Sequence, residues 1–169
     1  GSEMCIRDSL KAADSLEYNH LIVVGVALKR KVPHNYHWVY VPDDRVVFHR
    51  YAYISNYSPQ NAPPGKGSLL VEVTVPGRRQ LADEHVKEIE QRVIDGLVDI
   101  GIIKHEDVEF SASWYNEYGY PVYTIGHEEA RTKIYGYLQE QGIVSVGRWG
   151  SWHYWNMDRV LFAVKRVIG

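Results

Sequence analysis

The spacing of apolar residues predicts a β-sheet in the first two thirds of the chain. Apolar side chains at every second position predict strands at residues 69–75 and 108–114. The unbroken apolar run at residues 21–28 predicts a strand that is buried on both faces in the middle of the sheet. Residues 38–41 and 45–53 flank a Pro-Asp-Asp turn sequence and predict a hairpin.

Helical spacing of apolar residues predicts helices at residues 10–18, 81–100 and 127–139 and from Met157 onward. The second helix is expected to end at Gly101. Its carboxylates are expected to form a solvated face, and they are Asp83, Glu84, Glu88 and Glu90. The last helix has an apolar stripe of Met157, Val160, Leu161, Val164 and Ile168. Because β-α-β alternation is absent, we expect an α+β domain, with a mixed or antiparallel sheet and helices on one side.

The segment from Gly147 to Asp158 is predicted to run from a strand through a turn into the last helix. The apolar residues 143–146 predict the strand, and the Tyr-rich residues 115–123 predict an earlier turn. Asn156 is a favourable N-cap, and the Asp158 carboxylate suits the positive end of the helix dipole. Free amides at such a helix start can hold a phosphate or a polyol.

Side chains in this segment are suited to a flat ligand. Gly147 and Gly150 allow close approach of the backbone, and Arg148 supplies a permanent charge with a planar set of donors. Three of the five tryptophans of the chain lie here, together with Tyr154. Aromatic side chains also pack beneath loops without binding anything, so the spacing leaves both interpretations open.

Composition excludes several functional classes. A chain of 169 residues fits one domain, and its net charge of −2 gives no field for nucleic acid. Cys5 is the single cysteine, and the eight histidines form no His-Glu-x-x-His motif, so neither an internal disulfide nor a metal site is expected. His49 and His153 have no nucleophile or acid partner at fixed spacing, and a structural role is expected for both. No catalytic residue can be assigned.

Residues 1–9 are expected to be an artefactual or disordered leader. They resemble translated adapter read-through of metagenomic assemblies and are predicted to form neither helix nor strand. The longest apolar run, residues 21–28, is too short to cross a bilayer, and no signal peptide opens the chain. A cytoplasmic location without a membrane span is therefore expected.

Two motifs resemble a known family. Gly147-Arg148-x-Gly150 followed by Tyr154-x-Asn156-Met157-Asp158 resembles the C-terminal flavin-contacting motif of the FAD-dependent amine oxidase and protoporphyrinogen oxidase-like superfamily, and it is similar to the corresponding loop of UDP-galactopyranose mutases. The second motif resembles the substrate-domain core of bacterial members, often described as LPS-biosynthesis or amine oxidase-like proteins. It comprises Phe48-His49-Arg50, Ser55-Asn56-Tyr57-Ser58-Pro59, Ala62-Pro63-Pro64-Gly65, Ser68-Leu69 and Glu72-Val73. The similarity extends from about Ala12 to Lys165.

The resemblance implies a FAD cofactor and a small-molecule substrate, either an amine or a nucleotide sugar. Residues expected to contact the cofactor are Gly147, Arg148, Trp149, Gly150, Tyr154, Asn156, Met157 and Asp158. Residues expected beside the substrate are Arg50, Tyr118 and Tyr120. An ordinary exposed arginine at a strand end is the alternative for Arg50.

Family members resemble one another most at an N-terminal Rossmann segment with a G-x-G-x-x-G turn, and this sequence contains no such motif. The resemblance therefore implies a C-terminal fragment that is inactive alone. Residues 10–142 would form part of the substrate domain, and residues 143–169 would form the strand, turn and helix that complete the FAD-binding domain. The apolar stripe of the last helix would then lack its packing partner.

Three functions remain open. The first is a FAD-dependent oxidoreductase of the amine oxidase type. The second is a nucleotide-sugar isomerase like UDP-galactopyranose mutase, although mutases often carry an acidic residue where Asn156 stands. The third is an aromatic-rich, non-catalytic binding domain.

Overall fold

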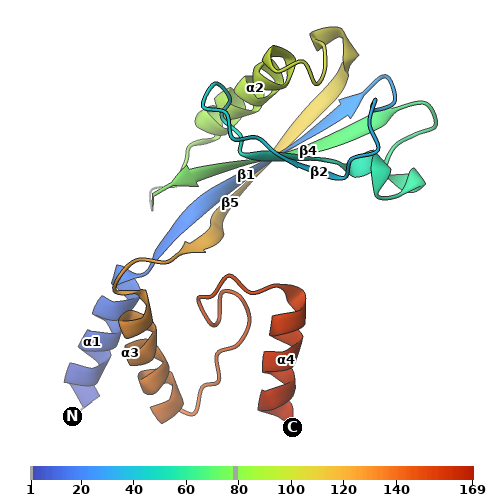
Figure 1. The fold of residues 1–169 in the computed structure, drawn as a ribbon. Coiled ribbons are helices and arrows are strands. Elements are labelled where there is room, and N and C mark those ends of the chain that lie inside the picture. Colours follow the sequence, from blue (N-terminus) through green and yellow to red (C-terminus); the bar gives the residue numbers. More distant parts are fainter. Residues whose placement is uncertain (1, 78–79) are drawn as a thin grey trace. The chain divides into compact units, whose positions relative to one another are not determined.

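The computed structural model describes residues 2–77 and 80–169 and divides the chain into two compact units. One unit comprises residues 20–119, and the other comprises residues 1–19 and 120–169. The first of these contains most of a sheet and one helix, and the second contains three helices and the segment before the last helix (Figure 1).

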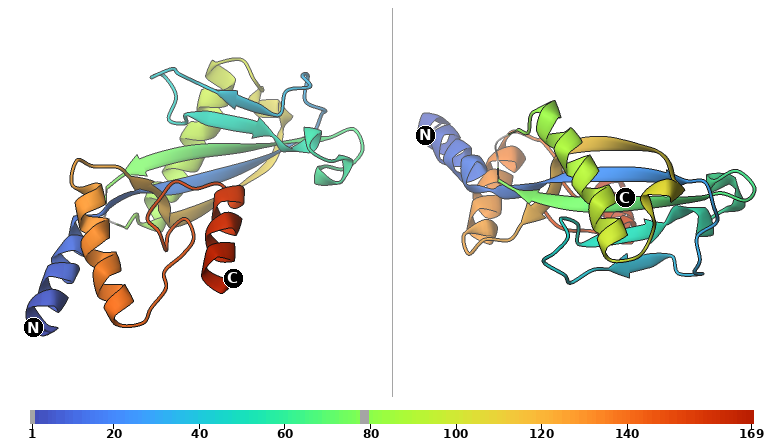
Figure 2. Two further views of the ribbon diagram at one scale, coloured as in Figure 1. Left: turned by 60° about the horizontal axis from the view of Figure 1, so that its bottom comes forward. Right: turned by 90° about the horizontal axis from the view of Figure 1, so that it is seen from above.

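A five-stranded antiparallel sheet is the main element of unit 20–119. Its strands are β1 (Glu17–Leu28), β2 (Trp38–Tyr40), β3 (Arg50–Tyr53), β4 (Gly67–Pro76) and β5 (Val108–Val122), in the order β2-β3-β4-β1-β5. Helix α2 (Asp83–Asp99) lies across one face of the sheet (Figure 2). The predicted α+β class and antiparallel sheet are confirmed.

The core lies between α2 and the sheet, because alternate residues of the strands face the helix. Ile22, Val24, Val26 and Leu28 of β1 are almost completely buried, as are Val93 and Leu97 of α2. Burial of each such side chain contributes about 1.5–3 kcal/mol to the free energy of unfolding. The neighbouring residues of β1 are only partly buried, so the prediction of a strand buried on both faces is only partly right.

The boundaries of α2 follow the sequence prediction, but one of its expected surface residues is buried. Helix α2 ends before Gly101, whose φ of 76° is the left-handed conformation that ends helices. Glu90 faces β5 rather than solvent and accepts hydrogen bonds of 2.6 Å from the hydroxyls of Ser111 and Ser113. Burial raises the pKa of Glu90, but these bonds and Lys87 outweigh it and lower the pKa overall. The predicted solvated face is therefore wrong at Glu90.

The predicted hairpin is confirmed, although its second strand is shorter than expected. Strands β2 and β3 pair antiparallel with Trp38 opposite Ala52 and Tyr40 opposite Arg50. In the loop between β2 and β3, the carboxylate of Asp43 accepts hydrogen bonds from the backbone N–H and the guanidinium of Arg45.

Three other predictions are wrong. The Tyr-rich residues 115–123 were predicted to form a turn, but β5 continues to Val122, because this part of the chain remains in the sheet. Residues 143–146 form no strand. The first helix, α1 (Ser2–Ser15), begins within residues 1–9 and ends before Tyr18, where β1 has already started.

The second unit is built around helices α1 and α3 (His127–Glu140). They pack through a small cluster of Ala12, Leu16 and Ala130, with Ile134 and Trp152 at its edge. The last helix, α4 (Met157–Ile168), has no buried residue. Its expected apolar stripe is exposed at Met157 (85% of the surface accessible), Leu161 (70%) and Ile168, and partly buried at Val160 and Val164. Among the described residues, no helix combines the length and apolar character needed to cross a bilayer.

The position of Leu97 in the core gives a stability prediction. Leu97→Ala removes a fully buried side chain that contacts the sheet, and we expect it to lower the free energy of unfolding by about 2–5 kcal/mol. Leu161→Ala on exposed α4 is the matched control and should change it by less than about 0.5 kcal/mol. Urea unfolding followed by circular dichroism measures both variants, and equal effects would contradict the assigned core.

Candidate functional site

Residues 147–156 form a tight irregular segment in front of α4. The backbone N–H of Ser151 donates to the carbonyl of Gly147 over 2.7 Å, and that of His153 donates to the carbonyl of Arg148 over 2.9 Å. Gly147 has a φ of 106°, which favours glycine. A Cβ added at Gly150 would lie 2.3 Å from the carbonyl oxygen of Val146. Both glycines are therefore required by the backbone itself.

Arg148 is held beside two tyrosine rings. Its Nε donates to the carbonyl of Trp155 over 2.9 Å, and its guanidinium carbon lies 4.6 Å from the ring centroid of Tyr154 and 5.9 Å from that of Tyr120. The two rings are 5.2 Å apart. Within the described ranges no carboxylate forms an ion pair with Arg148. The group combines a permanent cation with aromatic surface, a combination suited to phosphate and planar rings.

Helix α4 begins at this group. Asn156 occupies the N-cap position, as predicted, but its side chain makes no capping hydrogen bond. The first backbone amides of a helix have no intrahelical partner, so those of Met157 and Asp158 can bind an anion. Asp158 lies in the first turn and competes with an anion for the positive end of the dipole.

Four side chains at intervals of four residues hold the segment in place. Arg131 Nε donates to the carbonyl of Ser151 over 2.7 Å, and His127 Nε2 contacts the carbonyl of Trp152 over 2.8 Å, which requires a proton on Nε2. The hydroxyl of Tyr135 donates to the carbonyl of Gly150. The hydroxyl of Tyr123 accepts the backbone N–H of Tyr154 over 2.7 Å. Sequence reasoning missed these residues, although their spacing was visible.

The tryptophans of the segment mainly pack within the unit. Trp149 and Trp152 meet edge to face, with ring centroids 5.0 Å apart, and Trp155 stacks on His153 at 5.3 Å. Trp152 has a φ of 48°, which is unusual for a residue with a side chain. Trp149, Gly150 and Trp152 line a cavity of about 240 Å³ beside α1 and α3. For these rings the packing interpretation is the better one, whereas the guanidinium of Arg148 and the rings of Tyr154 and Tyr120 lie together beside the start of α4.

His153 is part of this packing. Partial burial lowers its pKa, and the positive charge of Arg131 lowers it further. Its Nδ1 lies 3.3 Å from the Tyr123 hydroxyl. Both effects favour the neutral form of His153, whose ring supports the segment by stacking on Trp155. In residues 2–77 and 80–169, no group of three or more potential ligand side chains is placed to hold a metal ion.

Arg50 lies in the other unit, on the face of the sheet opposite α2. It is paired across β3 and β4 with Glu72, and its guanidinium lies 4.5 Å from the ring centroid of Trp38. Both charged side chains are about nine-tenths buried, so an ordinary exposed arginine is the wrong description. Glu72 points away from the core, because the alternate residues Val71 and Val73 of β4 face it. Tyr118, on β5 of the same unit, is half exposed.

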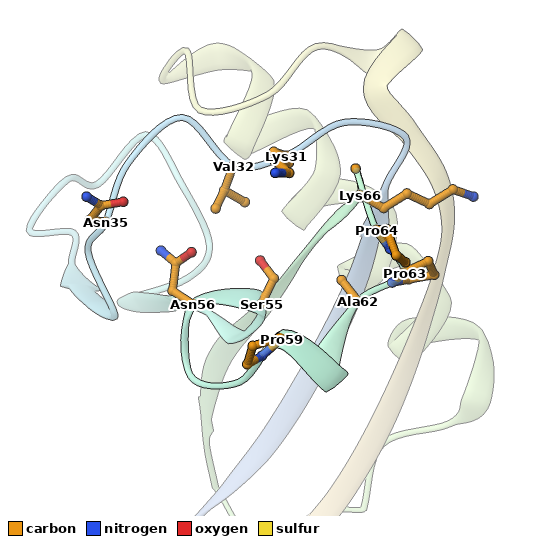
Figure 3. Close-up of a pocket in the computed structure, with 11 residues that line it drawn as sticks. Lys31, Val32, Asn35, Ser55, Asn56, Pro59, Ala62, Pro63, Pro64 and Lys66 are labelled. Carbon is orange, nitrogen blue, oxygen red and sulfur yellow. The ribbon is translucent and has the colours of Figure 1, made fainter.

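Part of the second sequence motif, within residues 55–65, lines a cavity of about 460 Å³ at one end of unit 20–119. Figure 3 shows Asn35 and Asn56 on one side of the cavity and Pro63 and Pro64 on the other. The amide of Asn56 donates to the carbonyls of His34 and Tyr36, and the amine of Lys66 bonds to Glu109 over 2.6 Å. Asn56 therefore holds the loop at residues 34–36, and Lys66 joins its own loop to β5.

The buried Arg50–Glu72 pair gives the second prediction. Glu72→Ala leaves a buried guanidinium without its carboxylate, and we expect a loss of about 3–5 kcal/mol in the free energy of unfolding. Glu106→Ala removes a carboxylate from an exposed pair with Lys104 and should cost less than about 1 kcal/mol. Urea unfolding compares the two variants. A loss below 1 kcal/mol for Glu72→Ala would show that solvent reaches Arg50.

Comparison with known proteins identifies solved structures that share this fold. No protein-family model matches the chain. A structure of reduced UDP-galactopyranose mutase is 30% identical, with a TM-score of 0.76 over 85% of this chain and 31% of the mutase. A protein from Exiguobacterium sp. 255-15 assigned as a protoporphyrinogen oxidase is 20% identical, with a TM-score of 0.63 over 82% of this chain and 32% of that protein. A Pyrococcus furiosus protein is 16% identical, with a TM-score of 0.52 over 89% of this chain and 38% of that protein.

The last two similarities show the fold alone, whereas the first adds sequence identity. The chain spans about a third of the length of the proteins that it matches. The resemblance predicted from the two motifs is confirmed: the chain is similar in fold to about a third of a UDP-galactopyranose mutase and of a protein assigned as a protoporphyrinogen oxidase, and it is similar in sequence to the mutase.

Proposed function

We propose that the chain is part of a flavin-dependent enzyme that acts on a nucleotide sugar, with the chemistry of a mutase. The observation that carries this proposal is the group of Arg148, Tyr154 and Tyr120 at the start of α4, in a chain 30% identical to a UDP-galactopyranose mutase. A guanidinium binds phosphate through paired donors, and tyrosine rings suit a planar base or a sugar face. These are the chemical parts of a nucleotide sugar.

The segment before α4 also fits a flavin nucleotide. The amides of Met157 and Asp158 have no intrahelical partner, and the side chain of Asn156 leaves the helix start open. Gly147 and Gly150 keep side chains off the turn. A bound FAD would be held by the residues expected from the sequence, except for Trp149, whose ring packs against Trp152. The remaining residues are Gly147, Arg148, Gly150, Tyr154, Asn156, Met157 and Asp158.

The flavin supplies the reactive ring when bound, and the chain supplies charge and position. Arg148 would stabilise negative charge on the reduced flavin or on a substrate phosphate. The aromatic surface around it would limit access of water. Arg50, beneath Trp38 on the sheet, and Tyr118 are the further residues proposed for the substrate.

Two alternatives remain from the sequence. Flavin-dependent oxidation of the amine oxidase type is the first alternative. The protein from Exiguobacterium sp. 255-15 assigned as a protoporphyrinogen oxidase shares the fold, but at 20% identity the similarity shows the fold alone. One residue speaks against the mutase proposal. Asn156 stands where many mutases carry an acidic residue, and its amide keeps the hydrogen-bonding capacity but not the negative charge. A non-catalytic binding domain has in its favour the exposed apolar face of α4.

We propose that this face packs against a Rossmann part of a longer flavoprotein, because the chain spans 31% of the mutase that it matches. Exposed apolar patches of this kind mark interaction surfaces. The third prediction is that the chain alone purifies colourless and shows no activity, because half of the cofactor site lies outside it. Absorbance in the flavin bands after gel filtration measures this, and stoichiometric FAD would contradict the proposal.

The fourth prediction concerns the longer flavoprotein. It should convert UDP-galactopyranose only after its flavin is reduced, whereas an oxidase would reduce its flavin with an amine and consume oxygen. Arg148→Ala should lower kcat/KM by about 10- to 100-fold, because it removes a charge-assisted contact worth about 1.5–3 kcal/mol. Arg166→Ala, on exposed α4, is the matched control and should leave kcat/KM within about twofold. Turnover with oxidised flavin would contradict the mutase proposal.

A further inference from the structure

Four side chains in and before α3 bind consecutive backbone groups of the segment in front of α4. Tyr135, Arg131 and His127 bind the carbonyls of three successive residues, Gly150, Ser151 and Trp152. One helical interval earlier, Tyr123 binds the N–H of Tyr154. Residues four apart lie on one face of a helix, so α3 presents its three members as a row along the segment. We call Tyr123, His127, Arg131 and Tyr135 the α3 row.

We propose that the α3 row positions Arg148 and Tyr154 for ligand binding, by fixing the backbone of residues 150–154. The inference rests on the proposed function, because it assigns a purpose to the arrangement of those two side chains. None of the four residues is required to touch the ligand, so each is a positioning residue.

The connection from the row to Arg148 is short. The row holds Trp152 and Tyr154 directly, and His153 between them donates its N–H to the carbonyl of Arg148 over 2.9 Å. The guanidinium of Arg148 in turn bonds to Trp155 and lies over the ring of Tyr154. Arg148 is thus attached at its backbone and at its side chain to residues that the row fixes.

The segment needs such support because it has no regular structure of its own. No strand or helix is present at residues 141–156, and Trp152 adopts a left-handed conformation that is unfavourable for a residue with a Cβ. Such conformations persist only where surrounding contacts determine them. The row supplies contacts on both sides of Trp152, at Ser151 and at Tyr154.

The carboxylate of Glu128, next to the row, determines which nitrogen atoms of Arg131 and His127 bind the segment. One terminal nitrogen of Arg131 bonds to Glu128 over 2.7 Å, which leaves Nε for the carbonyl of Ser151. Nδ1 of buried His127 lies 3.4 Å from the same carboxylate, which leaves Nε2 for the carbonyl of Trp152.

The test compares hydroxyl deletions in the ¹⁵N-labelled chain. Tyr123→Phe and Tyr135→Phe each remove one bond of the row and keep the ring, and Tyr137→Phe on the same helix is the control because its hydroxyl makes no bond within the described residues. The first measurement is the resonance of Arg148 Nε–H, which neither tyrosine touches. The second is the affinity for UDP as probe, by titration calorimetry.

We expect both row variants to shift or broaden the Arg148 Nε–H resonance and to weaken UDP binding about fivefold each, the effect of one hydrogen bond. Tyr137→Phe should change neither. An unchanged Arg148 resonance in Tyr123→Phe and Tyr135→Phe overturns the inference, whatever happens to UDP binding. If the wild-type chain binds no UDP, the nucleotide-sugar proposal fails, and the resonance still decides whether the row positions Arg148.

A replacement at His127 separates positioning from simple loss of packing. His127→Gln keeps an amide donor for the Trp152 carbonyl, whereas His127→Leu fills the space without one. The inference requires the Arg148 resonance to stay near its wild-type position in His127→Gln and to move in His127→Leu. The same displacement in both variants would show that the side-chain bond is irrelevant. This pair also decides the matter should a tyrosine variant fail to fold.

Discussion

The carbonyls of Gly150, Ser151 and Trp152 are bound by side chains rather than by neighbouring backbone, and the shape of the candidate site depends on this constraint. A turn that is bound from outside can hold Arg148 beside Tyr154 and still leave the first amides of α4 open. Backbone pairing in a strand would have used the same carbonyls. The irregular structure at this point is therefore what makes a binding surface available.

The two units differ in how they are stabilised. Unit 20–119 has a continuous apolar core between α2 and the sheet, including Val24 and Leu97. In the unit that carries the segment, the described residues form only a small cluster of Ala12, Leu16 and Ala130, and no residue of the last helix is fully buried. Polar contacts and ring stacking replace an apolar core there.

Features that depend on local spacing were predicted from the sequence. The N-cap position of Asn156, the apolar stripe of α4 and the end of α2 at Gly101 all follow from neighbouring residues. Features that depend on partners distant in the sequence were not predicted. Glu90 is buried because Ser111 and Ser113 lie opposite it, and residues 143–146 form no strand because no partner strand pairs with them, leaving Ile143 and Val144 exposed. The sequence motif predicted Arg148 as a site residue, but the side chains that hold its segment in place could be recognised only in the folded chain.

The most direct measurement titrates FAD into the ¹⁵N-labelled chain and maps the backbone amides whose resonances move. The account predicts that weak binding shifts the amides of residues 147–158, with the largest changes at Met157 and Asp158, whose N–H groups face no intrahelical acceptor. Shifts confined to the cavity beside Pro63 and Pro64, or no shift at residues 147–158 at millimolar FAD, would contradict a cofactor site at the start of α4.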